Sequence, residues 1–188
     1  MNLRNLQIDK SWTLFLDRDG VINRRIVGAY ARRWDEFEFL PGATIAIAAF
    51  SRVFGRLVVV TNQQGVGKGL MTIDDVVAVH RQMVSEIEKS GGRIDSVFFS
   101  PHLSSDHNFN RKPGLGMALK ARKKFPEIRF KKSLMAGDSL SDMIFGKRCG
   151  MKTAMIADDH AAAKCHPRLI DFVYPDLISL AREFDLSS

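Results

Sequence analysis

Residues 13–20 read Thr-Leu-Phe-Leu-Asp-Arg-Asp-Gly, an apolar run that ends at once in two acidic residues and a glycine. The run is continuous rather than alternating, which is typical of a strand buried on both faces of a parallel sheet. Similar β-rich runs lie at 57–61, 97–99, 133–136, 153–156 and 172–174. The sequence therefore predicts a series of short, buried strands.

Helical patterns separate these runs. One pattern at 42–54 follows Pro41, which suits the first turn of a helix, and Thr72 with Asp75 resembles a capping box before an apolar stripe. Further helices are expected at about 115–125, 141–149 and 176–184. Alternating strands and helices predict an α/β fold, a doubly wound parallel sheet with helices on both faces.

The composition is that of a globular protein. The chain has 188 residues, of which 45% are hydrophobic and 26% charged, and no internal repeat or linker divides it. We therefore expect one domain over 1–188. The apolar stretch 12–16 is cut short by the acidic residues, so we expect no signal peptide, no membrane partner and a cytoplasmic location. Cys149 and Cys165 are expected to be free thiols.

A net charge of +7 favours anionic partners in general. Part of the excess lies in one basic stretch, which we interpret as a solvated helix face and turn, with nucleic-acid contact as the alternative. Its members are Lys120, Arg122, Lys123, Lys124, Arg129, Lys131 and Lys132.

Polar residues lie at the carboxyl ends of several predicted strands. In open α/β sheets, ligands bind at these ends. The polar residues are Asp17 and Asp19 after the first strand, Thr61 and Asn62 after the second, and Asp138 after the fourth. Converging carboxylates repel one another unless a cation neutralises them, so these residues predict a Mg²⁺ site.

Such a site suits phosphoryl transfer. Asp17, directly after the strand, is the candidate nucleophile, and Asp19 is the candidate general acid and base. Thr61 and Lys112 would bind the phosphoryl group, and Arg111 could bind a second anionic group. Asp142 would support the metal site from behind. The glycine-rich stretch 65–69 is not a P-loop, because Asn62 and Gly69 replace residues that loop requires.

Four sequence blocks together resemble the haloacid dehalogenase superfamily of phosphatases. Within this superfamily, the sequence most resembles the branch that contains D-glycero-D-manno-heptose 1,7-bisphosphate 7-phosphatases and histidinol-phosphate phosphatases. The blocks are Phe15-Leu16-Asp17-Arg18-Asp19-Gly20-Val21-Ile22-Asn23, Val58-Val59-Val60-Thr61-Asn62-Gln63, Arg111-Lys112-Pro113 and Gly137-Asp138-Ser139-Leu140-Ser141-Asp142.

The resemblance implies a nucleophilic Asp17 and an acid–base Asp19. It implies Mg²⁺ held by the Asp17 side chain, the Asp19 carbonyl and Asp138, and a fold with little or no cap domain. Residues assigned by it to phosphate or substrate binding are Thr61, Asn62, Gln63, Arg111 and Lys112.

Many members of this branch have a zinc-binding loop, and this sequence departs from that pattern. The equivalent positions read Ser100, His102, Asn108 and Asn110, so three of four ligands are missing. Structural zinc requires closed coordination, and we expect none, with His102 and His107 as ordinary loop residues.

We expect a Mg²⁺-dependent phosphomonoesterase, a monomer, acting on a small phosphorylated metabolite through an aspartyl-phosphate. Heptose 1,7-bisphosphate is the leading substrate and histidinol phosphate the alternative. A polynucleotide 3′-phosphatase and a non-catalytic phosphate-binding protein stay open. The arginines beside the first block favour a second phosphate on the substrate, although they could equally be solvated; they are Arg24, Arg25, Arg32 and Arg33.

Overall fold

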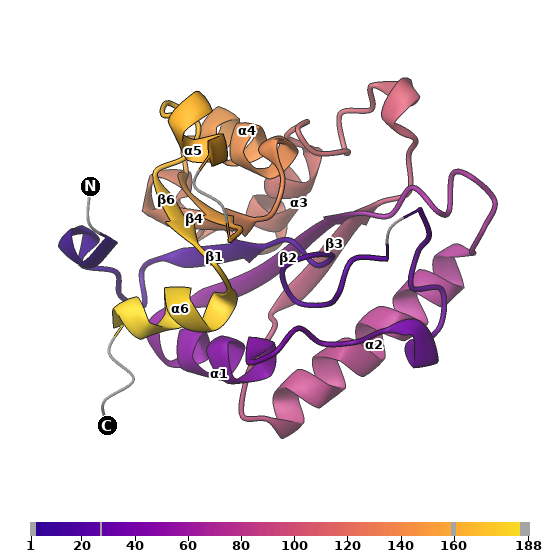
Figure 1. Ribbon diagram of the computed structural model, residues 1–188, viewed down its shortest axis with the longest axis horizontal. Helices are drawn as coiled ribbons and strands as arrows, with labels where there is room; N and C mark the ends of the chain where they lie inside the picture. The colour runs from indigo at the N-terminus through magenta and orange to yellow at the C-terminus, as the bar shows by residue number, and fades with distance from the viewer. Residues whose placement is uncertain (1–2, 27, 159–160, 185–188) are drawn as a thin grey trace.

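A single six-stranded sheet forms the centre of the computed structural model, which describes residues 3–26, 28–158 and 161–184 (Figure 1). All neighbouring strands are parallel, in the order β3-β2-β1-β4-β5-β6. The strands are β1 Thr13–Leu16, β2 Arg56–Asn62, β3 Ser96–Ser100, β4 Ser133–Gly137, β5 Lys152–Ile156 and β6 Phe172–Tyr174. The predicted doubly wound sheet is confirmed.

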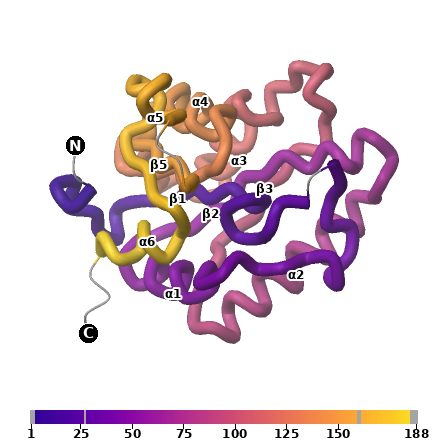
Figure 2. Tube along the Cα trace, viewed as in Figure 1, coloured from indigo at the N-terminus to yellow at the C-terminus, as the bar shows by residue number. Residues whose placement is uncertain are grey.

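Helices cover both faces of this sheet. In Figure 1, α1, α2 and α6 lie on one side and α3, α4 and α5 on the other. Their bounds are α1 Ala43–Val53, α2 Ile73–Lys89, α3 Gly116–Lys124, α4 Leu140–Cys149, α5 Ala161–Cys165 and α6 Leu177–Ala181. No cap domain interrupts the described chain, because the segment from β1 to α1 is a short excursion that packs against α2 (Figure 2).

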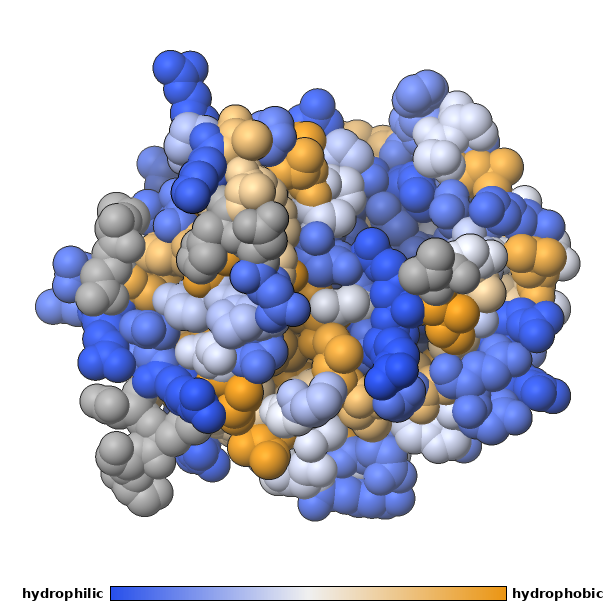
Figure 3. All heavy atoms as spheres, viewed as in Figure 1, coloured by the Kyte–Doolittle hydropathy of each residue, from blue (hydrophilic) through white to orange (hydrophobic). Residues whose placement is uncertain are grey.

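The side chains of β1 show why the first run is continuously apolar. Leu14 and Leu16 pack in the core beneath α1, α2 and α6, whereas Phe15 packs in the opposite core beneath α3 and α4. Successive residues of a strand point to opposite faces, so a strand covered on both sides must be apolar at every position. On the surface shown in Figure 3, hydrophilic residues dominate and apolar ones form separate small groups.

Local differences from the predicted elements have simple causes. Gly42, with φ 73°, caps α1, so Pro41 lies just before the helix rather than in its first turn. Strand β2 extends one residue beyond the predicted run 57–61 at each end, so that Asn62 is its last residue. The short α5 was not predicted, whereas the capping box of Thr72 and Asp75 is confirmed.

Both cysteines of the chain, Cys149 and Cys165, are free thiols, as expected. Within the described ranges, every helix is too short or too polar to cross a membrane.

Candidate active site

A pocket of about 420 Å³ opens at the carboxyl ends of β1 and β2. It contains predicted site residues from three of the four sequence blocks, together with three basic or aromatic side chains from loops. The predicted residues are Asp17, Asp19, Thr61, Asn62, Arg111 and Lys112, and the others include Arg25, Tyr30 and Lys68.

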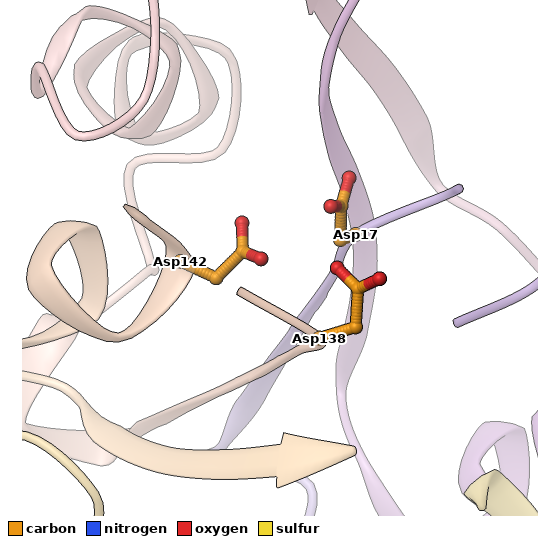
Figure 4. Close-up of side chains that lie close together, drawn as sticks. All are labelled: Asp17, Asp138 and Asp142. Atoms are coloured by element: carbon orange, nitrogen blue, oxygen red, sulfur yellow. The ribbon is translucent and has the colours of Figure 1, made fainter. Parts of the chain in front are cut away.

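Asp17 lies where β1 ends and is almost fully buried. One of its carboxylate oxygens lies within 4.8 Å of one oxygen each of Asp138 and Asp142, which are likewise within 4.8 Å of each other; the three residues come from the ends of β1 and β4 and the start of α4 (Figure 4). Burial and the nearby charge of Asp142 raise the pKa of Asp17 to about 7. The cluster therefore favours either protonation or a bound cation.

Asp138 and the Asp19 carbonyl face a common point. The Arg25 guanidinium lies 2.7 Å from Asp138 Oδ1 and 3.3 Å from the Asp19 carbonyl oxygen. A positive group can thus bridge these two oxygen donors. Burial raises the pKa of Asp138 to about 6, against the opposing effect of Arg25. Hard oxygen donors grouped in this way fit Mg²⁺.

Lys112 is buried beneath the pocket, with its ammonium group held on three sides. Its Nζ lies 2.8 Å from Asp17 Oδ1 and 2.6 Å from Asp142 Oδ1, and it donates to the Val60 carbonyl at 2.7 Å. Burial by itself lowers the pKa of Lys112, but the two carboxylates raise it above the usual lysine value. Asp142, expected behind the metal site, therefore also anchors this lysine.

Asn62 fixes the Lys112 backbone in a two-way contact. Its side-chain amide donates to the Lys112 carbonyl at 3.1 Å, and its side-chain oxygen accepts from the Lys112 N–H at 3.0 Å. The contact joins the second and third sequence blocks across the pocket floor. Asn62 lines the pocket and also positions its neighbour.

Gln63, expected to bind the substrate, lies behind the pocket instead. Its side chain is fully buried and does not line the pocket. Its amide donates to Asp19 Oδ2 at 2.7 Å and to Thr61 Oγ1 at 2.9 Å. Because Thr61 accepts this bond, its own hydroxyl proton is left to donate toward the pocket.

Two curated relatives share much of this sequence. The D-glycero-alpha-D-manno-heptose-1,7-bisphosphate 7-phosphatase of Mycobacterium bovis is 46% identical over 132 residues, covering 70% of each chain. The D-glycero-beta-D-manno-heptose-1,7-bisphosphate 7-phosphatase of Rhodopseudomonas palustris is 37% identical over 147 residues, covering 73% of this chain and 78% of the relative. The HAD-hydrolase-like family model matches residues 109–180.

A solved structure agrees with these sequence matches. The D,D-heptose 1,7-bisphosphate phosphatase from B. bronchiseptica, complexed with magnesium and phosphate, has a TM-score of 0.81 at 28% identity. The match covers 92% of this chain and 97% of that one. The chain belongs to the HAD hydrolase family. The predicted resemblance and fold are thereby confirmed.

Most of the arginines beside the first block of this HAD hydrolase do not face its pocket. Arg24 pairs with Glu38, Arg32 with Glu36 and Arg33 with Asp35, at 3.0, 3.2 and 3.3 Å. Arg25 is the member of the group that lines the pocket. Arg24, Arg32 and Arg33 thus fit the interpretation of solvated surface residues, whereas Arg25 fits that of a substrate contact.

The loop at 100–110 of this HAD hydrolase is held by protein contacts. The Asp106 carboxylate accepts from the Leu103 N–H at 2.9 Å, and the Asn108 side chain accepts from the Asn110 N–H at 2.8 Å. The loop presents the His102 carbonyl, which accepts a 3.1 Å hydrogen bond from Arg111. These contacts place Arg111 in the pocket wall.

Two contacts in this HAD hydrolase were not expected from its sequence. Arg18, between the two acidic residues of the first block, is fully buried and donates to Asp19 Oδ1 at 2.8 Å. Its other terminal nitrogen lies 3.0 Å from His80 Nε2 on α2. An arginine inside an apolar strand end is a signal of a buried charge, but nothing in the sequence indicates His80 as its partner.

Proposed function

We propose that this HAD hydrolase is a phosphomonoesterase that releases the 7-phosphate of a heptose 1,7-bisphosphate through a phosphorylated Asp17. The observation that carries the proposal is the convergence of Asp17, Asp19, Thr61 and Lys112 on one pocket. Each supplies a group that phosphoryl transfer needs: a nucleophile, an acid–base group, a hydroxyl donor and a positive charge near the phosphoryl oxygens.

In the first step, a carboxylate oxygen of Asp17 attacks phosphorus, and the bond from phosphorus to the sugar oxygen breaks. Asp19 in its acid form gives its proton to the leaving oxygen. In the second step, Asp19 accepts a proton from water, and the water oxygen attacks phosphorus. Inorganic phosphate leaves and the Asp17 carboxylate is restored. Proton transfer at Asp19 is thus balanced over the cycle.

Thr61 donates its hydroxyl proton to an oxygen of the transferred phosphoryl group. Lys112, whose three N–H groups already contact Asp17, Asp142 and the Val60 carbonyl, offsets the negative charge of that group by its positive charge. Lys112 also steadies Asp17, which accepts at Oδ1 from both the lysine and the Arg18 backbone N–H, the latter at 2.7 Å. The nucleophile is therefore oriented before the substrate binds, which lowers the entropic barrier to attack.

Asp17, Asp138 and the Asp19 carbonyl would hold Mg²⁺, and the raised pKa values of both carboxylates fit a site that a cation completes. When bound, Mg²⁺ would offset the negative charges of nucleophile and phosphate that otherwise repel each other. The relative from B. bronchiseptica is complexed with magnesium and phosphate, which supports a Mg²⁺ site in this HAD hydrolase.

A second phosphate on the substrate is supported by the basic groups of the pocket wall. Arg25, Lys68 and Arg111 all line the pocket. Lys68 lies 5.5 Å from the Tyr30 ring centroid, and within the described residues neither Lys68 nor Arg111 forms an ion pair. Their charge is available to a dianion, which favours a bisphosphate over the cationic histidinol phosphate.

The basic stretch gives no support to a polynucleotide substrate, because it lies near the amino ends of the strands. Lys124 contacts Ser96 at the start of β3, and Lys132 contacts Ser11 just before β1. The pocket opens at the opposite, carboxyl ends of these strands. A bound oligonucleotide would have to span the sheet to use both features.

Phosphate release from a substrate panel tests the proposal. The panel contains both anomers of heptose 1,7-bisphosphate, histidinol phosphate and a 3′-phosphorylated oligonucleotide, with Asp17→Asn as the blank. We expect fastest turnover, as kcat/KM, for a heptose bisphosphate. Faster release from histidinol phosphate or the oligonucleotide would reassign the substrate, and no release by the Mg²⁺-loaded protein would indicate a binding protein.

A further inference from the structure

The Arg18 guanidinium is enclosed in the core and has few polar contacts. The side chain is fully buried, with its carbon Cζ 5.9 Å from the Phe37 ring centroid. One terminal nitrogen donates to Asp19 and the other contacts His80, while Nε has no hydrogen-bond partner among the described residues. Two contacts at opposite tips therefore hold a buried charge in place.

His80 is suited to hold the guanidinium without neutralising it. Its ring is buried on α2 and packs edge-on against Phe99 at 5.7 Å between centroids. Burial, and then the charge of Arg18, lower the pKa of His80 to about 3, so the ring is neutral and Nε2 accepts. A carboxylate at this position would compete with Asp19 for the arginine.

The contact matters because Arg18 orients Asp19. Asp19 Oδ1 also accepts from Asn23 at 3.0 Å, and Oδ2 accepts from Gln63. Asn23 and Gln63 are neutral donors, so Arg18 supplies the charged hydrogen bond of the set, the stronger kind. If the far end of the guanidinium were released, the Asp19 carboxylate would lose its strongest restraint.

We propose that His80 is a positioning residue that acts through Arg18 to aim the Asp19 carboxyl group at the leaving oxygen of the substrate. The inference rests on the proposed function, in which Asp19 is the general acid. His80 lies outside all four sequence blocks, does not line the pocket, and is linked to Asp19 by its contact with Arg18.

The test compares the single-turnover rate of leaving-group release from two substrates, because the later hydrolysis step uses Asp19 as the base with either of them. A sugar phosphate leaves as an alkoxide and depends on proton donation, whereas p-nitrophenyl phosphate leaves as a stable anion and hardly does. General acids contribute about 10²–10⁴-fold to rate, so we expect His80→Leu to slow leaving-group release from the sugar phosphate by about 10–100-fold. For p-nitrophenyl phosphate we expect less than about a 3-fold change. His80→Gln, which keeps a neutral acceptor, should restore most of the lost rate.

Met83→Ala is the matched control, since Met83 is buried on the same helix. It should lower the melting temperature and affect both substrates equally. If His80→Leu does not fold, His80→Asn, which is polar but too short to reach Arg18, takes its place. Equal effects of the His80 variant on both substrates would overturn the inference.

Asp19→Asn separates this inference from the proposed function. If Asp19→Asn selectively impairs the sugar phosphate but the His80 variant does not, the positioning role of His80 is wrong and the acid role of Asp19 stands. If Asp19→Asn slows leaving-group release from both substrates alike, the proposed function itself fails at the acid step.

Discussion

Gly20 lies against the carboxyl group of Asp138, so closely that a Cβ on Gly20 would stand 1.9 Å from Asp138 Oδ2. The glycine also has φ +85°, a backbone conformation that L side chains rarely adopt. The first and fourth sequence blocks therefore meet at a point where a side chain on Gly20 cannot fit. The expected Mg²⁺ ligands can converge because this position has no side chain.

Gly20→Ala should therefore weaken Mg²⁺ binding by at least about 10-fold, because Asp138 must move away from the added methyl group. A positive φ alone costs about 1–2 kcal/mol in an alanine. Gly150→Ala is the control, since Gly150 has φ +81° and a Cβ added there would meet no heavy atom of the described residues within 4 Å. Both variants should lose thermal stability, but calorimetric titration should find weakened Mg²⁺ binding in Gly20→Ala alone.

Lys112→Met should lower the free energy of unfolding of the protein and abolish turnover. The substitution leaves Asp17 and Asp142 buried without their counter-charge, and breaking a buried ion pair costs about 3–5 kcal/mol. Lys147→Met is the control, because Lys147 pairs with Asp171 at 2.6 Å in a more exposed place. There we expect a loss of about 1 kcal/mol or less. Urea denaturation measures both, and equal losses would contradict the argument.

Mg²⁺ binding should depend on pH. The pKa values of Asp17 and Asp138 are raised to about 7 and about 6, so below those values protons occupy the groups that Mg²⁺ needs. Binding must then release protons, and affinity should fall as pH falls, by up to about 10-fold per pH unit for each group. The rise in melting temperature on adding Mg²⁺ should be larger at about pH 7.5 than at about pH 5.5, values that lie on either side of these pKa values. A shift independent of pH would contradict this.

Arg25→Gln should tighten Mg²⁺ binding in the absence of substrate. The Arg25 guanidinium bridges Asp138 and the Asp19 carbonyl, so it competes with a cation there. Because its side chain is half exposed, the effect should be modest, about 2–5-fold by the usual strength of exposed ion pairs. Arg24→Gln is the control, since Arg24 pairs with Glu38 instead. Calorimetry should find unchanged Mg²⁺ affinity in the control.

The loop at 100–110 should need no zinc. We expect elemental analysis of the purified protein to find zinc well below one ion per chain, because Ser100, Asn108 and Asn110 replace good zinc ligands. A zinc-selective chelator should leave the melting temperature unchanged. Stoichiometric zinc, or unfolding on its removal, would refute this prediction.

Local sequence was enough to predict the strands and most of the helices. It also predicted that the site lies at the carboxyl ends of the strands. Apolar runs such as 13–16 reveal strands buried on both faces, and Thr72 with Asp75 marks the start of α2. The acidic residues that follow β1 and β4 then fall at one edge, because parallel strands end together. These features depend on residues that are close together in the sequence, so sequence patterns can predict them.

The tertiary structure alone decided which way the polar side chains face. Gln63 turns inward to Asp19, and Asp142 reaches Lys112. His80 meets Arg18 across 62 positions of the chain. Such pairings depend on the packing of α2 and α4 against the sheet and on rotamers chosen in a close-packed core, and no short-range pattern encodes either.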